Sequence, residues 1–185
     1  MEYVYRLNLP SFYEAKLPDF SLDKFFVNSL IRGHKPVEFL KPEYCQLKNL
    51  DWIFSLSFKK DPRSISIIHI DNPNLEDPLL KWGINWIVGN GGMKYWHREQ
   101  IDSHVVENDE SGYIRPKLNI TQPCFRDYKT VDGGVYLVNA SAPHQAYNDD
   151  PNLIRYALST RIDFKNNTKT WKEVVELFKD LIIEY

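Results

Sequence analysis

The amino-acid sequence predicts a mainly β protein with helices near its two ends. Three observations indicate this fold class: short runs rich in β-branched and aromatic residues, turn residues between those runs, and helical patterns only toward the termini. Helical crossovers between the expected strands are mostly missing, which argues against a parallel, doubly wound sheet. An antiparallel sandwich or barrel fits the pattern better.

The N-terminal part, residues 1–63, is expected to be a helical or mixed support for the strands. Residues 21–33 have the pattern of a helix, with Ser21 as a plausible N-cap and Gly33 as a plausible end. Residues 47–58 are ambiguous between helix and strand.

Residues 64–164 are expected to form the β core. The expected strands cover residues 64–70, 82–88, 93–96, 135–139 and 154–162. Glycine, asparagine and aspartate between these runs supply turn conformations. The turns are expected at residues 90–92, 132–134 and 148–152. The aromatic cluster in the second and third of these strands is expected to be mostly core, and consists of Trp82, Trp86, Tyr95 and Trp96.

The last segment, residues 168–185, is expected to be a helix. Thr170 and Glu173 have the spacing of a capping box, in which each side chain hydrogen-bonds a backbone N–H of the other. An apolar stripe follows at helical spacing and is interpreted as core packing against a sheet. Its members are Val174, Leu177, Phe178, Leu181 and Ile182.

Length and charge restrict the class of protein. The chain has 185 residues and 43% hydrophobic residues, which fits one globular domain. With 25 acidic and 23 basic residues, a broad surface for nucleic acid or an anionic membrane is not expected. Cys45 and Cys124 are far apart, and no signal peptide or membrane span is recognised. These features together predict a cytoplasmic protein with no nucleic-acid or membrane partner.

His69 and Asp71 are candidate metal ligands at the end of an expected strand. Alternate residues of a strand share a face, so both side chains can approach one ion. About 0.7 His-x-acid pairs arise by chance in a chain with 5 His and 25 acids, so the pair alone is weak evidence. The alternative is that Asp71 caps the turn that follows it. A second pair, His97 and Glu99, lies in a charged run and is interpreted as solvated.

His144 and Arg155 follow in the second half of the chain. His144 comes after an expected strand, and a third ligand there would complete two histidines and one carboxylate, which leaves three neighbouring positions open on Fe(II). Arg155 lies eleven residues later, on the next strand. An inward-facing arginine requires an anion, such as a dicarboxylate ligand. The alternatives are a structural acidic partner or a solvent-facing side chain.

These residues resemble the pattern of the Fe(II)/2-oxoglutarate-dependent dioxygenase superfamily, especially its aspartyl- and prolyl-hydroxylase-like members. That pattern is His-x-Asp, a long gap, His, and then Arg or Lys about ten residues later. The surrounding segments HIDN, KWGINWIVGN, LVNASAPHQAYN and RYALSTRI also match. The resemblance covers about residues 64–164 and implies a double-stranded β-helix, the jelly-roll fold also found in cupins.

The resemblance implies roles for individual residues. His69, Asp71 and His144 would bind Fe(II), and Arg155 would bind the far carboxylate of 2-oxoglutarate. Many members have Arg-x-Ser, whereas Tyr156 and Ala157 follow the arginine here. The second cosubstrate contact therefore stays open among Asn85, Ser159 and Arg161. The aspartate ligand implies hydroxylation, because related halogenases have a small residue at that position.

The reaction implied is hydroxylation of a peptidyl side chain, an amino acid or a small metabolite, with O₂ consumed and succinate and CO₂ released. A candidate mobile loop over the site consists of His97, Arg98, Glu99, His104 and the polar stretch 107–112. Two alternatives remain: a cupin-like metal protein that does not use 2-oxoglutarate, and a non-catalytic β-helix binding module. Metal content separates the second alternative from the others, and succinate production separates the first from the oxygenase.

Overall fold

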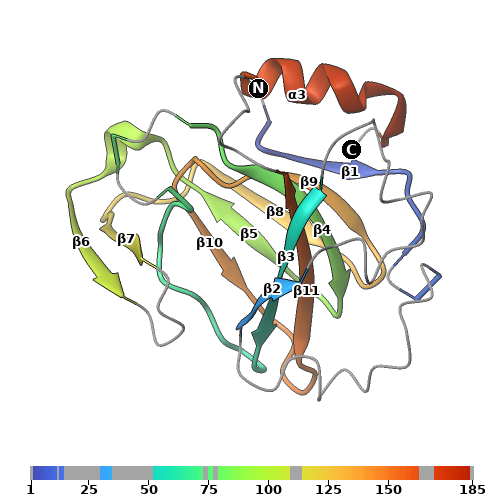
Figure 1. The fold of residues 1–185 in the computed structure, drawn as a ribbon. Coiled ribbons are helices and arrows are strands. Elements are labelled where there is room, and N and C mark those ends of the chain that lie inside the picture. The colour runs from blue at the N-terminus through green and yellow to red at the C-terminus, as the bar shows by residue number, and fades with distance from the viewer. Residues whose placement is uncertain are drawn as a thin grey trace.

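The computed structural model of this chain is mainly β, and its strands pair antiparallel. The residues that the structure describes are 2–11, 13–14, 30–34, 52–72, 75–76, 79–108, 114–162 and 169–183. The prediction of a β-rich protein with antiparallel sheets is therefore confirmed (Figure 1). In the described part of the chain, no helix is long and apolar enough to span a membrane.

A seven-stranded sheet contributes one wall of the molecule. Its strand order is β12-β1-β9-β4-β11-β3-β2, so neighbouring strands are often far apart in sequence. The strands are β1 (Val4–Leu7), β2 (Leu30–His34), β3 (Trp52–Lys60), β4 (Trp82–Val88), β9 (Val135–Asn139), β11 (Arg155–Ile162) and β12 (Ile182–Ile183).

A smaller set of strands lies opposite. The three-stranded sheet has the order β10-β5-β8, and a two-stranded ribbon pairs β6 with β7. These strands are β5 (Gly91–Tyr95), β6 (Ser103–Asn108), β7 (Ile114–Asn119), β8 (Arg126–Thr130) and β10 (His144–Tyr147). The extended segment 64–70 joins the two parts, because His69 forms isolated bridges with both β10 and β7.

Two apolar clusters hold the layers together. The first packs one face of the large sheet against helix α3 (Trp171–Phe178) and includes Trp82 and Trp86. The second fills the space between the two sheets and includes Ile87 and Tyr95. Both faces of β4 are covered in this way, which explains why every residue of its WGINWIV sequence is buried. The expectation that Trp82, Trp86, Tyr95 and Trp96 are core residues is confirmed.

The two expected helices have different outcomes. Residues 21–29 lie outside the described part of the chain, but Leu30–His34 form strand β2, so the end of the expected helix 21–33 is wrong. Backbone pairing with β3 makes this segment a strand, because such pairing outweighs the local helix propensity. Most of the ambiguous stretch that ends at residue 58 belongs to β3.

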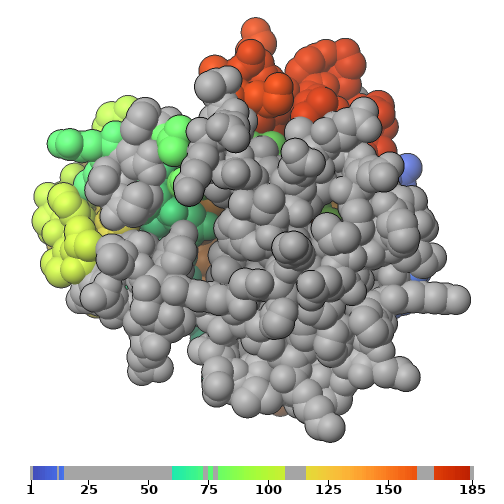
Figure 2. Space-filling model, viewed as in Figure 1, coloured from blue at the N-terminus to red at the C-terminus, as the bar shows by residue number. Residues whose placement is uncertain are grey.

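The C-terminal helix is present but shorter than expected. Thr170 and Glu173 form the predicted capping box, and Val174 and Phe178 are buried. The α-helix ends at Phe178, however, and a 3₁₀ turn (Lys179–Leu181) leads into β12. Strand β12 lies at the edge of the large sheet, where it pairs with β1, and β1 takes over the backbone hydrogen bonds there. Figure 2 shows α3 at the surface, at the top of the visible face.

Two expected strands also differ in detail. Segment 64–70 is extended but makes only isolated bridges, rather than a continuous ladder. Strand β5 begins at Gly91, so the turn before it is tighter than expected and is centred on Gly89 and Asn90. In the region of the candidate loop, a short 3₁₀ turn (Arg98–Gln100) and strand β6 are formed, while residues 109–113 lie outside the described part.

Candidate metal centre

His69 and His144 lie directly opposite each other on neighbouring extended segments. Their backbones exchange two hydrogen bonds, from N of His69 to O of His144 at 3.0 Å and back at 2.9 Å. The two rings lie 4.4 Å apart between centroids. Asp71, two residues beyond His69, is held by a 2.9 Å hydrogen bond from its backbone N to O of Ala140. Backbone pairing therefore brings together residues that are 75 positions apart in sequence.

The three side chains form a compact group that could hold a metal ion. One ligand atom from each of His69, Asp71 and His144 lies within 4.8 Å of the others, and all three residues are buried. Nε2 of His69 lies 3.5 Å from Oδ1 of Asp71. Two imidazoles and one carboxylate are a donor set that suits Fe(II) and related divalent ions.

Backbone carbonyls orient both rings. Nδ1 of His69 lies 3.0 Å from O of Ile67, and Nδ1 of His144 lies 2.9 Å from O of Ala142. Because a carbonyl oxygen only accepts, each Nδ1 carries the proton and donates it. Nε2 of each ring then has its lone pair available toward the space between the rings and Asp71. Such second hydrogen bonds are typical of metal-binding histidines.

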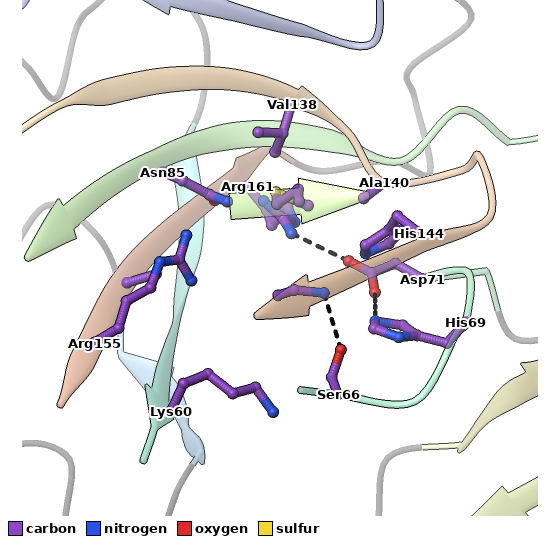
Figure 3. Close-up of a pocket in the computed structure, with 13 residues that line it drawn as sticks. Lys60, Ser66, His69, Asp71, Asn85, Val138, Ala140, His144, Arg155 and Arg161 are labelled. Carbon is purple, nitrogen blue, oxygen red and sulfur yellow. Dashed lines mark hydrogen bonds and ion pairs between the residues drawn. The ribbon is translucent and has the colours of Figure 1, made fainter. Parts of the chain in front are cut away.

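Arg161 holds the carboxylate of the group. Its Nη2 donates to Oδ2 of Asp71 at 3.1 Å, which leaves Oδ1 on the side of His69 (Figure 3). Nη1 of the same guanidinium donates to Oγ of Ser159. Both residues were candidates for the cosubstrate contact, and the structure instead gives each a contact within the Asp71 network. Their role toward a cosubstrate stays a prediction.

The protonation states of the group favour metal binding. Burial opposes ionisation of Asp71, but the adjacent His69 and the positive charge of Arg161 outweigh it and hold the pKa of Asp71 well below its usual range. Burial, followed by the nearby His69 ring, lowers the pKa of His144 to about 3. At neutral pH Asp71 is therefore a carboxylate and His144 a neutral imidazole, as metal ligation requires.

A cavity of about 70 Å³ adjoins the metal group. Its walls come from the large sheet, the small sheet and the segment that carries His69, so it lies between the two layers. A single water needs about 10–15 Å³ of such space, so the cavity has room for a small organic molecule. Among the described residues that line it, Asp71 supplies the one carboxylate, whereas Lys60, Arg155 and Arg161 are cationic.

Arg155 reaches into this cavity from the first position of β11. Its side chain is only 3% exposed, and its Nη2 donates to Oγ1 of Thr130 at 3.2 Å. Among the described residues, Nε of Arg155 has no hydrogen-bond partner and the guanidinium makes no ion pair. Burial lowers the pKa of Arg155 to about 10. A cation that is buried without an ion-pair partner among the described residues is a strong indication of an anionic ligand.

Asn85, on β4, is a second polar residue of the cavity wall. It is buried and lines the cavity, and its Oδ1 has no partner within the described part of the chain. The role of Asn85 toward a cosubstrate stays a prediction. Lys60 and Thr130 also belong to this region and were not singled out by the sequence. Lys60 lies two residues beyond the ambiguous stretch 47–58, and Thr130 lies on a strand that no turn motif or periodicity marked.

The second His-x-acid pair does not join the metal group. His97 and Glu99 are exposed, and the His97 ring stacks on Phe125 with 3.9 Å between centroids. Gln100 caps the turn through a 2.7 Å hydrogen bond from the backbone N of His97. The interpretation of this pair as a solvated segment is confirmed.

Comparisons with known proteins leave the family open. No protein-family model matches the chain, and no curated protein matches it. One similar solved structure is entitled "Crystal Structure of EvdMO1", with 12% sequence identity and a TM-score of 0.46. The match covers 72% of this chain and 34% of that chain, so this chain corresponds to about a third of that protein. At this distance the likeness assigns neither family nor activity.

Proposed function

We propose that this chain is an Fe(II)- and 2-oxoglutarate-dependent oxygenase of the hydroxylase type. The observation that carries the proposal is one cavity with two complementary ends. One end has the buried group of His69, Asp71 and His144, and the other has the buried Arg155 without a carboxylate partner among the described residues. A ligand that chelates a metal with one end and presents a carboxylate with the other fits this cavity.

The arrangement of sheets supports the same proposal. A double-stranded β-helix encloses its ligand site between two antiparallel sheets, and the cavity here lies between the large and small sheets. We therefore propose this jelly-roll fold for residues 64–164. A reducing compartment such as the cytoplasm, expected from the two widely separated cysteines, would also keep iron in the Fe(II) state.

Each residue then has a defined task. His69 and His144 bind the iron through Nε2, and Asp71 binds it through Oδ1 while Arg161 holds Oδ2. Arg155 binds the far carboxylate of 2-oxoglutarate in a charge-assisted pair, and the buried walls exclude water from the bound cosubstrate. Bound iron, 2-oxoglutarate and O₂ supply the oxidising chemistry, with release of succinate and CO₂.

The substrate class is proposed only in outline. A peptidyl side chain, an amino acid or a small metabolite is expected, in keeping with a cavity of about 70 Å³. Hydroxylation is favoured over halogenation because Asp71 occupies a ligand position and leaves no room for a halide there. Profiling of peptides and metabolites for a mass gain of one oxygen would identify the substrate.

The first test is spectroscopic. Metal-free protein receives Fe(II) and then 2-oxoglutarate without oxygen, and the weak visible charge-transfer band of chelated 2-oxoglutarate is measured. We expect the band in wild type, its loss in His69→Ala, and its weakening in Arg155→Ala. His97→Ala is the matched control, because His97 is exposed and outside the metal group. Wild-type protein that binds iron but shows no band would refute the use of 2-oxoglutarate and favour a cupin-like metal protein.

A further inference from the structure

We propose that a row of aromatic rings next to the metal group carries oxidising equivalents to the protein surface when no substrate is bound. The row consists of the rings of His144, Tyr95 and Tyr128. This inference rests on the proposed function, because the oxidant is the iron centre after it has reacted with O₂ and 2-oxoglutarate. The row protects the cavity, since a centre that finds no substrate to oxidise is reduced by Tyr128 instead of reacting with the residues around it.

The small sheet holds these rings in contact. The Tyr95 ring stacks on the ring of His144, with 5.7 Å between centroids and 28° between planes. Tyr128 packs edge-on against Tyr95, with 5.5 Å between centroids. Both distances are typical of directly packed aromatic rings, which are about 4.5–7 Å apart. An electron therefore crosses the row in two short steps.

Strand register fixes the order of the row. His144 on β10 is the direct partner of Tyr95 on β5. Tyr128 on β8 is the direct partner of Met93, which lies two residues before Tyr95 and therefore on the same face of β5. The row thus crosses the sheet in its strand order, β10-β5-β8, and these strands lie side by side (Figure 1).

The hydrogen bonds of the two tyrosines give them different tasks. A tyrosine that gives up an electron also loses its hydroxyl proton, so it needs a base within hydrogen-bond reach. The hydroxyl of Tyr95 donates to the backbone O of Asn139 at 3.0 Å, and a carbonyl oxygen does not take up the proton. The hydroxyl of Tyr128 donates to the carboxylate of Glu2, which does. Tyr95 therefore passes the electron on, and Tyr128 is the residue that stays oxidised.

The electron and the proton of Tyr128 leave in opposite directions. The electron moves through Tyr95 to the oxidised iron, which is reduced by one unit. The O–H bond of Tyr128 breaks, and its proton moves to Glu2. Glu2 and Tyr128 both line an open surface hollow, so a small thiol from solvent can return a hydrogen atom to Tyr128. The thiol becomes a thiyl radical, and Glu2 releases its proton to water.

The experiment detects the tyrosyl radical itself. Fe(II)-loaded protein with 2-oxoglutarate, but without substrate or thiol, is mixed with O₂ and frozen for electron paramagnetic resonance. The variants are Tyr95→Phe, Tyr128→Phe and Glu2→Gln, and Zn(II)-loaded wild type gives the background. Tyr13→Phe is the matched control, because Tyr13 also donates to a carboxylate, that of Asp132 at 2.9 Å, but is 54% exposed and lies outside the row.

We expect the radical signal in wild type and in Tyr13→Phe, and its loss in Tyr95→Phe and Tyr128→Phe. Glu2→Gln removes the base from the surface end of the row and should lower the signal, which tests the row without a change beside the metal group. The charge-transfer band of chelated 2-oxoglutarate, measured before O₂ is added, should stay at the wild-type level in Glu2→Gln and Tyr128→Phe.

Two results would overturn this inference alone. One is a wild type that shows the band and consumes 2-oxoglutarate without forming a radical. The other is a radical of wild-type intensity in Tyr95→Phe or in Glu2→Gln. Absence of the charge-transfer band in wild type would instead overturn the proposed function on which the inference rests.

Discussion

The guanidinium of Arg161 donates to Oδ2 of Asp71 at 3.1 Å, while Oδ1 of the same carboxylate faces Nε2 of His69 at 3.5 Å. The two oxygens of Asp71 therefore have separate partners. One is held by a buried cation and the other is directed toward the candidate metal position. With a metal bound, this division would make the carboxylate a one-oxygen ligand and would leave more positions around the ion open for other molecules.

Replacing Arg161 should weaken metal binding. In Arg161→Met the carboxylate of Asp71 loses its orientation, and removal of such a supporting contact typically costs about 10- to 100-fold in metal affinity. Titration with Co(II), followed by its visible absorption, measures the effect. Arg126→Met is the control, because Arg126 pairs with Glu2 at the surface. Unchanged affinity in a folded Arg161→Met protein would contradict the positioning role.

Acidification should destabilise the metal-free protein through His144. Its pKa is lowered from 6.5 to about 3 by burial and by the neighbouring His69, so the unfolded chain binds a proton between these values that the native protein does not. Stability is then fully present above pH 6.5 and falls as the pH decreases toward 3. Urea denaturation midpoints at pH 7, 6 and 5 measure this fall. His144→Gln should show a smaller dependence, and an equal one would assign the effect to other groups.

Thr130 should matter for the cosubstrate and not for the metal. Thr130→Val removes the 3.2 Å hydrogen bond to Nη2 of Arg155 but keeps the side-chain shape. We expect about 10-fold weaker binding of 2-oxoglutarate, because hydrogen bonds to charged groups contribute roughly 1.5–3 kcal/mol. The charge-transfer titration measures this loss, and Co(II) affinity should stay at the wild-type value. Thr130→Ser retains the hydroxyl and should bind nearly normally, whereas a parallel loss of Co(II) affinity would indicate general damage.

Two glycines should tolerate alanine very differently. Gly91 has φ +140°, and a Cβ there would meet the backbone O of Tyr147 and lie 2.8 Å from Cδ of Arg155. Gly133 has φ +73°, and its nearest neighbour would be Cβ of Ser11 at 3.5 Å. We expect Gly133→Ala to cost roughly 1–2 kcal/mol of unfolding free energy and Gly91→Ala about 3 kcal/mol.

Chemical denaturation compares these two alanine variants. Gly91→Ala should also displace Arg155 and weaken 2-oxoglutarate binding, which Gly133→Ala should leave unchanged. Equal stability of the two variants would show that the close approach of Gly91 to Tyr147 and Arg155 does not constrain the fold.

Local sequence patterns were sufficient for the elements whose partners are near in sequence or whose composition is distinctive. A strand buried on both faces has a continuous apolar run, and the run in β4 predicted that strand. The T-x-x-E spacing predicted the start of α3, because capping depends only on residues within one turn. The proximity of His69 to Asp71 follows from strand periodicity alone. Their expected approach to His144 is found in the structure, while the ion that they would bind stays a proposal.

Long-range pairing decided the rest. Leu30–His34 and Ile182–Ile183 are strands because β3 and β1 supply their hydrogen-bond partners. A local helical pattern in the sequence does not show such distant partners. For the same reason, local sequence patterns did not predict the neighbours of Arg161 and Lys60. Arg161 hydrogen-bonds Asp71, and Lys60 pairs with Arg155 in the ladder between β3 and β11. Both contacts depend on the register of β11. The residue types available to the site can be read from the sequence alone. Which of the charged side chains meet depends on sheet register, because register sets the contacts between segments that are distant in the chain.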